Sequence, residues 1–359
     1  MKILDRYLLG QFLSWSAIGL ATFVLLFVVV DLFEKIDIFV DYKTPVPTIV
    51  KFYAYGLTTI ITQVLPVALL LGALLSLGQL RKFGELTAMQ ASGRSPWRLA
   101  APLLLSALFL SILQYGLNER FAADHYLQKE RILTEDIKKL SAADRESQAN
   151  VRLLGRGGRL WVAQFFDART EVLRNVSLQW LRPPTLAARI DAERARFDGE
   201  VWRFERGYLR AFHDSTETVL PFRAFASSDI LEIPQDFIRR KVDPFRAGMK
   251  ELLQYARRVG ESGGETQAYM TDFHLRASYP LSGLILVVLG TGLSLRVIRG
   301  SGFVVGIGVA LAVGFTYLAL IRAGQALGYH GTLPPALAAW IGNIVFGLIG
   351  GFIFWKVAR

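Results

Sequence analysis

The chain has 359 residues, of which 52% are hydrophobic and 20% are charged, and its formal net charge is +11. A hydrophobic share this large favours a membrane protein over an ordinary soluble globular one. Cysteine is absent and the four histidines are scattered, which excludes a disulfide framework, a thiolate metal site and a cysteine nucleophile, and leaves no close histidine pair for a metal ion.

Six stretches without Asp, Glu, Lys or Arg are long enough to cross a membrane as helices. A bilayer core of roughly 30 Å requires about 20 apolar residues of helix. The stretches cover residues 7–30, 52–80, 99–117, 277–295, 300–321 and 331–355. We therefore predict an α-helical polytopic membrane protein with three spans in residues 1–117, an inserted all-β domain with flanking helices in residues 118–276, and three further spans in residues 277–359.

Basic residues near the ends of these spans predict the orientation. Ten Lys or Arg residues lie at the termini and in the short loops on one side, against four on the other side. Since loops rich in Lys and Arg remain in the cytoplasm, both termini are expected there and residues 118–276 on the outer side. The positive net charge then reflects membrane insertion and not nucleic-acid binding.

The insert between the third and fourth spans has its own pattern. Residues 119–147 have helical spacing of apolar positions, and residues 233–264 turn helical again. Between them, six short segments rich in β-branched and aromatic residues are bounded by Gly, Asp or Pro, which predicts an antiparallel sandwich or a jelly-roll-like domain. An open edge of such a sheet can receive a strand from another protein; alternatively, the domain folds only on itself.

Motifs of several catalytic classes are missing. No Gly-Lys dipeptide occurs, so the phosphate-binding loop of P-loop ATPases is excluded. A His-Glu-x-x-His pair is absent as well. The six predicted spans also lack the buried ionisable residues that ion-coupled carriers commonly contain. The sequence therefore contains no P-loop for ATP hydrolysis and no ionisable residue within its spans for ion coupling.

The fifth span is rich in glycine. Gly302 and Gly306 share one helix face, and Gly308 and Gly314 further reduce its side-chain bulk. Tight packing against a neighbouring helix explains this pattern. Alternatively, the helix slides or separates from its neighbour and forms one side of a gate.

The loop between the second and third spans contains a short amphipathic segment near residues 81–95. Its apolar positions include Leu86 and Met89, and Glu85 stands among basic residues. Gly93 can end the segment, and Pro96 suits the first turn of the next helix. Such a segment is suited to docking on a cytoplasmic partner, whereas a solvated connector would need no apolar face.

Several motifs, in this order and spacing, resemble the LptF/LptG family, the permease subunits of the lipopolysaccharide-transport ABC exporter. They are Asp5-Arg-Tyr at the start, Asp31-Leu-Phe-Glu-Lys-Ile-Asp after the first span, Gly84-Glu-Leu-Thr-Ala-Met-Gln-Ala-Ser-Gly in the inner loop, and Pro334-Pro at the last span. The resemblance covers the whole chain. The opening and the inner-loop motif look nearer to LptG than to LptF.

The resemblance implies a permease of the bacterial inner membrane with cytoplasmic termini and a periplasmic jelly-roll domain. Its partners would be an LptF-type second permease and an LptB-type ATPase dimer, which binds ATP and Mg, so that this chain needs no cofactor. Lipopolysaccharide would leave the outer leaflet of this membrane through a lateral gate between spans one and five. It would then pass to a periplasmic bridge of LptC-type and LptA-type proteins.

The resemblance also implies roles for individual residues. In the family the inner loop is the coupling helix, so Glu85 would be the central residue that docks on the ATPase, with the segment shaped by Gly84, Leu86, Ala88, Met89 and Gly93. Some LptG members place basic residues near the outer end of span one against lipid A phosphates. Because Asp31 and Glu34 stand there in this chain, the lipid-binding candidates are Lys35, Lys43 and Arg322. The gate helix would use Gly302, Gly306, Gly308 and Gly314.

Two other classes of function are compatible with six spans. A membrane-anchored scaffold would recruit partners through its outer domain and would need no docking loop. An integral membrane lipid-modifying enzyme would need polar catalytic groups near a membrane surface. The nearest candidates, Asp31, Glu34, Asp37 and His330, form no recognisable catalytic group in the sequence.

Overall fold

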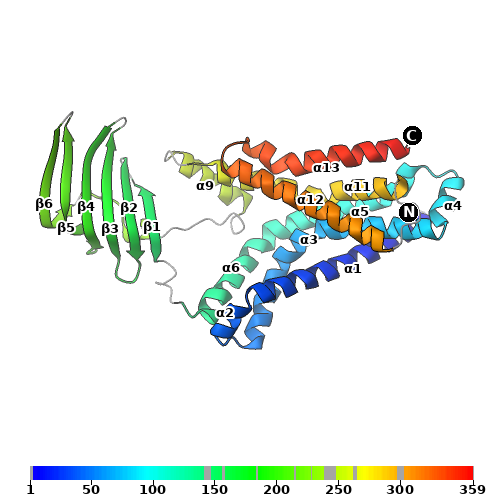
Figure 1. The fold of residues 1–359 in the computed structure, drawn as a ribbon, viewed down its shortest axis with the longest axis horizontal. Coiled ribbons are helices and arrows are strands. Elements are labelled where there is room, and N and C mark those ends of the chain that lie inside the picture. Colours follow the sequence, from blue (N-terminus) through cyan, green and yellow to red (C-terminus); the bar gives the residue numbers. More distant parts are fainter. Residues whose placement is uncertain are drawn as a thin grey trace. The chain divides into compact units, whose positions relative to one another are not determined.

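The computed structural model describes residues 3–140, 147–155, 158–182, 185–213, 216–227, 229–237, 248–261, 265–296 and 303–358. The chain forms two compact units, a helical unit of Met1–Leu133 and Val242–Arg359 and a sheet unit of Thr134–Lys241. Figure 1 shows both, and each is treated separately below. From the sequence, residues 118–276 were predicted to form one domain. By their contacts, however, the helices before and after the sheet belong to the helical unit.

Six helical segments of the described residues are long and apolar enough to cross a membrane, which confirms the predicted three plus three spans. They are α1 (Ile3–Glu34), α3 (Val46–Lys82), α5 (Pro96–Leu117), α10 (Gln267–Ser278) with η3 (Tyr279–Leu281) and α11 (Ser282–Arg296), α12 (Phe303–Tyr329) and α13 (Pro335–Ala358). The fourth span begins at Gln267 and not at residue 277, because the helix continues from the polar stretch into the apolar one with only the 3-10 turn at Pro280 between α10 and α11. Asp272 and Arg276 therefore belong to a membrane helix.

Helix α3 is the centre of the helical unit. It packs against α1, α11 and α12, and every residue from Pro66 to Leu77 is buried. At Gly72 it lies close to α1, because a Cβ atom there would overlap the Ser16 side chain. Glycine at this position therefore sets how closely the two backbones approach.

The third span continues beyond α5, as predicted, through η1 (Asn118–Ala122), α6 (Ala123–Arg131) and η2 (Ile132–Ile137). Helix α6 packs on α3 through His125 and Lys129. The His125 Nδ1 lies 2.7 Å from the Thr58 Oγ1, and the Lys129 Nζ lies 4.6 Å from the centre of the Phe52 ring. Burial lowers the pKa of Lys129. Through its contact with Thr58, His125 connects α6 to α3.

The inserted domain is all-β, as predicted, and each of the six expected strand segments forms a strand. The strands are β1 (Gln148–Leu154), β2 (Arg159–Asp167), β3 (Val172–Arg182), β4 (Thr185–Phe197), β5 (Trp202–His213) and β6 (Thr216–Ser227). They pair antiparallel in chain order (Figure 1). This is the order of a meander, whereas a strict jelly roll consists of two Greek keys. The short connections between consecutive strands favour this simpler order.

A segment that follows β6 packs on the sheet. The side chain of Phe237, in α8 (Pro234–Phe237), is buried against Trp161 and Trp202, with ring centroids 5.0 and 5.3 Å away. The buried Glu232 pairs with Arg159 at 3.3 Å, and its carbonyl oxygen accepts a hydrogen bond from the Trp202 indole. Helix α9 (Met249–Glu261) follows and belongs to the helical unit. The helix expected over residues 233–264 is therefore observed in part, since residues 238–247 and 262–264 lie outside the description.

Candidate functional site

A cleft of about 330 Å³ opens among the helices of the helical unit. Phe27 of α1 and Leu318 of α12 contribute to its walls, and α3, η1, α10 and η3 provide the remaining lining. Helices α1 and α12 both pack extensively on α3. The two helices that correspond to spans one and five therefore both contribute to the lining of this cleft.

Polar groups of α10 and α12 meet at this cleft. The buried Asp272, 5% exposed, accepts hydrogen bonds through its Oδ1 from the Tyr329 hydroxyl and, at 3.0 Å, from the Gln325 Nε2. The Gln325 Oε1 in turn accepts a hydrogen bond of 3.0 Å from Arg322. A carboxylate buried at a membrane helix costs free energy unless it is hydrogen-bonded. The network therefore holds the C-terminal part of α12 to α10.

Two arginines line the cleft. Arg322 comes from α12, and Arg276 comes from α10 and lies 3.5 Å from the Glu119 carboxylate. The Arg276 side chain is 11% exposed. Apolar walls beside two guanidinium groups make the cleft suited to an amphipathic anion, because arginine binds phosphate and carboxylate groups in a bidentate manner.

The three residues predicted to bind lipid lie in different places. Arg322 lines the cleft, whereas Lys35 forms an ion pair with Asp31 and Lys43 is exposed in a turn with a φ of 47°. Neither lysine is among the lining residues. The sequence prediction missed Asp272 and Arg276, because the fourth span was expected to begin after them. A signal that could have found them is the lack of Gly and Pro in residues 267–278, which directly precede the apolar helix.

The expected docking segment forms α4 (Glu85–Ala91) between two glycines with left-handed backbone angles. The φ angles are 75° at Gly84 and 83° at Gly93, where other residues are strained. Leu86 and Met89 are buried in a core cluster of the chain itself. Ala88 is exposed, and Glu85 is partly exposed. The apolar face thus anchors α4 to this chain and leaves the opposite face exposed.

Two of the four glycines predicted to pack the gate helix, Gly306 and Gly314, lie against α3. A Cβ atom at Gly306 would lie 2.9 Å from Leu75, and one at Gly314 would lie 2.8 Å from Val67. A Cβ at Gly308 would meet no atom within 4 Å of the described structure, and Gly302 lies outside the described residues. Two of these glycines therefore bring α12 close to the central helix.

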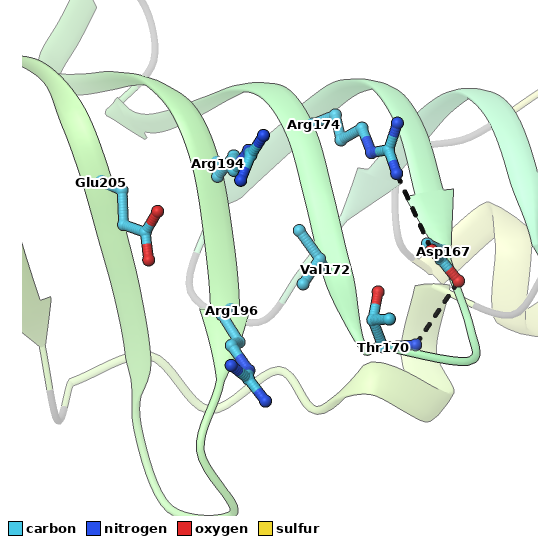
Figure 2. Close-up of a pocket in the computed structure, with 7 residues that line it drawn as sticks. All are labelled: Asp167, Thr170, Val172, Arg174, Arg194, Arg196 and Glu205. Carbon is cyan, nitrogen blue, oxygen red and sulfur yellow. Dashed lines mark hydrogen bonds and ion pairs between the residues drawn. The ribbon is translucent and has the colours of Figure 1, made fainter.

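A second hollow, of about 310 Å³, lies on the sheet unit (Figure 2). Charged side chains of neighbouring strands dominate its lining, which consists of Asp167, Thr170, Val172, Arg174, Arg194, Arg196 and Glu205. Burial tends to raise the pKa of Asp167, but hydrogen bonds from the Arg169 and Thr170 backbone lower it overall. The hollow has little apolar surface for an acyl chain, so we regard it as part of the solvated face of the sheet.

Removal of the Asp272 carboxylate tests whether it holds α12 to α10. In Asp272→Ala, Tyr329 and Gln325 lose a buried acceptor, and we expect a loss of about 1–3 kcal/mol in the free energy of unfolding. Thermal unfolding of the purified chain in detergent measures this. Asp272→Asn keeps one acceptor oxygen and should lose less. Equal melting temperatures for wild type and Asp272→Ala would contradict the structural role.

Comparison with models of known protein families identifies the family of this chain. The model of the family described as lipopolysaccharide export system permease LptF/LptG matches residues 6–356. A search of curated proteins finds no match. The matched range includes all six membrane helices, the sheet, α4 and the cleft. The chain therefore belongs to the LptF/LptG family of lipopolysaccharide export permeases.

Proposed function

We propose that this chain is the LptG-type half of the permease and admits lipopolysaccharide between α1 and α12. Family membership implies a heterodimeric, multi-pass inner-membrane permease that works with other components of lipopolysaccharide transport. The cleft between these two helices is the observation that carries the proposal. Its apolar walls suit acyl chains, and Arg276 and Arg322 suit the phosphates of a lipid headgroup.

The proposed orientation follows from the charges of the loops. Because basic residues concentrate on the side of the termini and α4, this side faces the cytoplasm and the sheet unit lies in the periplasm. Arg322, near the C-terminal end of α12, then lies toward the outer leaflet, from which lipopolysaccharide is taken. From the cleft the lipid passes to the LptC-type and LptA-type bridge.

Energy comes from a separate subunit in this proposal. An LptB-type dimer binds ATP and Mg, and α4 docks on it through Glu85. The partly exposed position of Glu85 and the exposed face beside Ala88 support this docking. The second permease is of the LptF type. The chain itself performs no covalent chemistry.

Reconstitution of the complete exporter tests this function. The purified complex in proteoliposomes should release lipopolysaccharide to a soluble bridge protein when ATP is added, without a change in the lipid mass. Release without ATP, or a chemically altered lipid, would contradict the proposal. Copurification of the chain without any ATPase would favour a scaffold instead.

A substitution at Arg322 tests the proposed contact with a lipid phosphate in the cleft. Loss of its charge-assisted contact with a lipid phosphate in Arg322→Ala should cost about 1.5–3 kcal/mol of binding, so that release at low lipid concentration falls about tenfold or more. Lys43→Ala is the matched control, because it removes an exposed cation away from the cleft. An equal loss in both variants would contradict the assignment to the cleft.

A further inference from the structure

The first turns of α1 contact the loop that contains α4, although α1 is not its neighbour along the chain. The Tyr7 hydroxyl donates a hydrogen bond of 2.9 Å to Glu85, the first residue of α4. Arg94, which follows the glycine after α4, donates one of 3.1 Å to the Asp5 carboxylate. Both ends of α4 are therefore joined to α1 by side chains.

Apolar packing reinforces these two contacts. Leu8 and Phe12 of α1 are fully buried in the core cluster that also contains Leu86 and Met89 of α4. Each element thus contributes its buried face to the same core. Because close-packed interiors transmit displacement, the inner end of α1 has to follow a movement of α4.

Helix α1 extends from this contact to the cleft. It is continuous from Ile3 to Glu34, contains no proline, and places Phe27 in the cleft wall. At about 1.5 Å per residue, its 32 residues make one long rod. A displacement of its first turns therefore reaches the residues that line the cleft.

The two walls of the cleft are held differently. Helix α12 is joined to α10 by the Asp272 network and to α13 by the hydrogen bond from Tyr317 to Asn343, which is 2.6 Å long. Helix α1 is joined to α3 instead, by hydrogen bonds from Trp15 to Gln79 and from Tyr53 to Asp31 that are 2.9 and 3.0 Å long. Its Leu25 and Leu26 are 66% and 55% exposed.

We propose that Asp5, Tyr7 and Arg94 are positioning residues that link the docking loop to the gate. Through them a displacement of α4 moves α1 and changes the width of the cleft. The link rests on the proposed function. In this proposal the first turns of α1 receive the displacement of the docking loop, in addition to forming part of a membrane span.

The test uses the complete exporter in nanodiscs and measures two quantities. The first is the ATP hydrolysed per lipopolysaccharide released. The second is the change in distance, on ATP binding, between spin labels on cysteines at residues 27 and 318, in a chain that has no cysteine of its own. In Tyr7→Phe, which removes a single oxygen atom, we expect a severalfold higher ATP-to-lipid ratio and a smaller distance change, with an unchanged ATPase rate.

Exchanging the charges of Asp5 and Arg94 tests the contact between these two residues separately from the contact of Tyr7. Asp5→Arg and Arg94→Asp should each raise the ATP-to-lipid ratio, and the double variant Asp5→Arg/Arg94→Asp should restore it. Tyr42→Phe, at an exposed tyrosine in the turn after α2 (Ile36–Asp41), is the matched control for Tyr7→Phe and should behave as wild type. Rescue by the exchange separates a positioning role from a general loss of stability.

The outcomes are distinct. Wild-type ratios and wild-type distance changes in Tyr7→Phe and in both single charge variants would overturn the link. A wild-type complex that hydrolyses ATP without releasing lipid would overturn the proposed function, and the spin-label distances would still decide whether α4 and α1 move together. If a charge variant fails to assemble, Tyr7→Phe alone decides.

Discussion

Joining α1 to α12 across the cleft is expected to stop lipopolysaccharide release. Phe27 of α1 and Leu318 of α12 both line the cleft, so the double variant Phe27→Cys/Leu318→Cys offers one thiol on each helix. The chain contains no cysteine, which leaves these two as its only thiols. Dithiol-specific crosslinkers of increasing length should react across the cleft, and the shortest that reacts should reduce release to background.

The loss of lipopolysaccharide release should depend on the crosslink between the two helices and not on the cysteine substitutions. Each single-cysteine variant, treated in the same way, should release lipid at the wild-type rate. A crosslinker that contains a disulfide should allow full recovery after reduction. Complete crosslinking with undiminished release would exclude this cleft as the route of entry. Failure of every crosslinker in the assembled exporter would show that the two helices do not face each other there.

The fold was largely predictable because membrane spans and short strands leave strong local patterns. A stretch of about 20 apolar residues without charge has few alternatives to a membrane helix. Gly93 and Pro96 likewise indicated where the short segment predicted near residues 81–95 ends and where the next helix begins. The strand segments were predictable from β-branched residues, and their pairing in chain order became known only from the structure.

The site was less predictable because it depends on contacts between distant segments. Asp272 and Gln325 meet across 53 residues, and Tyr7 and Glu85 across 78. Because predicted spans were required to contain no charged residue, Asp272 was left outside the fourth span. The free-energy cost of burying its carboxylate is offset by hydrogen bonds from another helix. The family resemblance made Arg322 one of three lipid-binding candidates, and the structure places it in the lining of the cleft.

Reversal of the charge at Glu85 is expected to uncouple ATP hydrolysis from lipid release. Glu85 is partly exposed, and in the proposed exporter it docks on the ATPase. Loss of one partner of a charge pair at an interface costs about 2–5 kcal/mol. Glu85→Lys should therefore lower ATP-driven release by more than about tenfold, since 1.4 kcal/mol corresponds to a factor of ten.

Two further substitutions identify which role of Glu85 is lost. Glu85→Gln keeps an oxygen that can accept the hydrogen bond from Tyr7 but removes the charge, so it should impair docking and leave the contact with α1 in place. Thr87→Lys adds a lysine on the exposed face of α4 and controls for added positive charge.

Copurification of the ATPase and the release assay separate the outcomes. If docking uses the charge, Glu85→Gln should lose ATPase binding together with Glu85→Lys, whereas Tyr7→Phe should retain it. Undiminished release by Glu85→Lys would contradict the docking role. Retained ATPase binding with lost release in Glu85→Lys would instead place the role of Glu85 in transmission to α1, because the hydrogen bond from Tyr7 is then the contact whose loss matters.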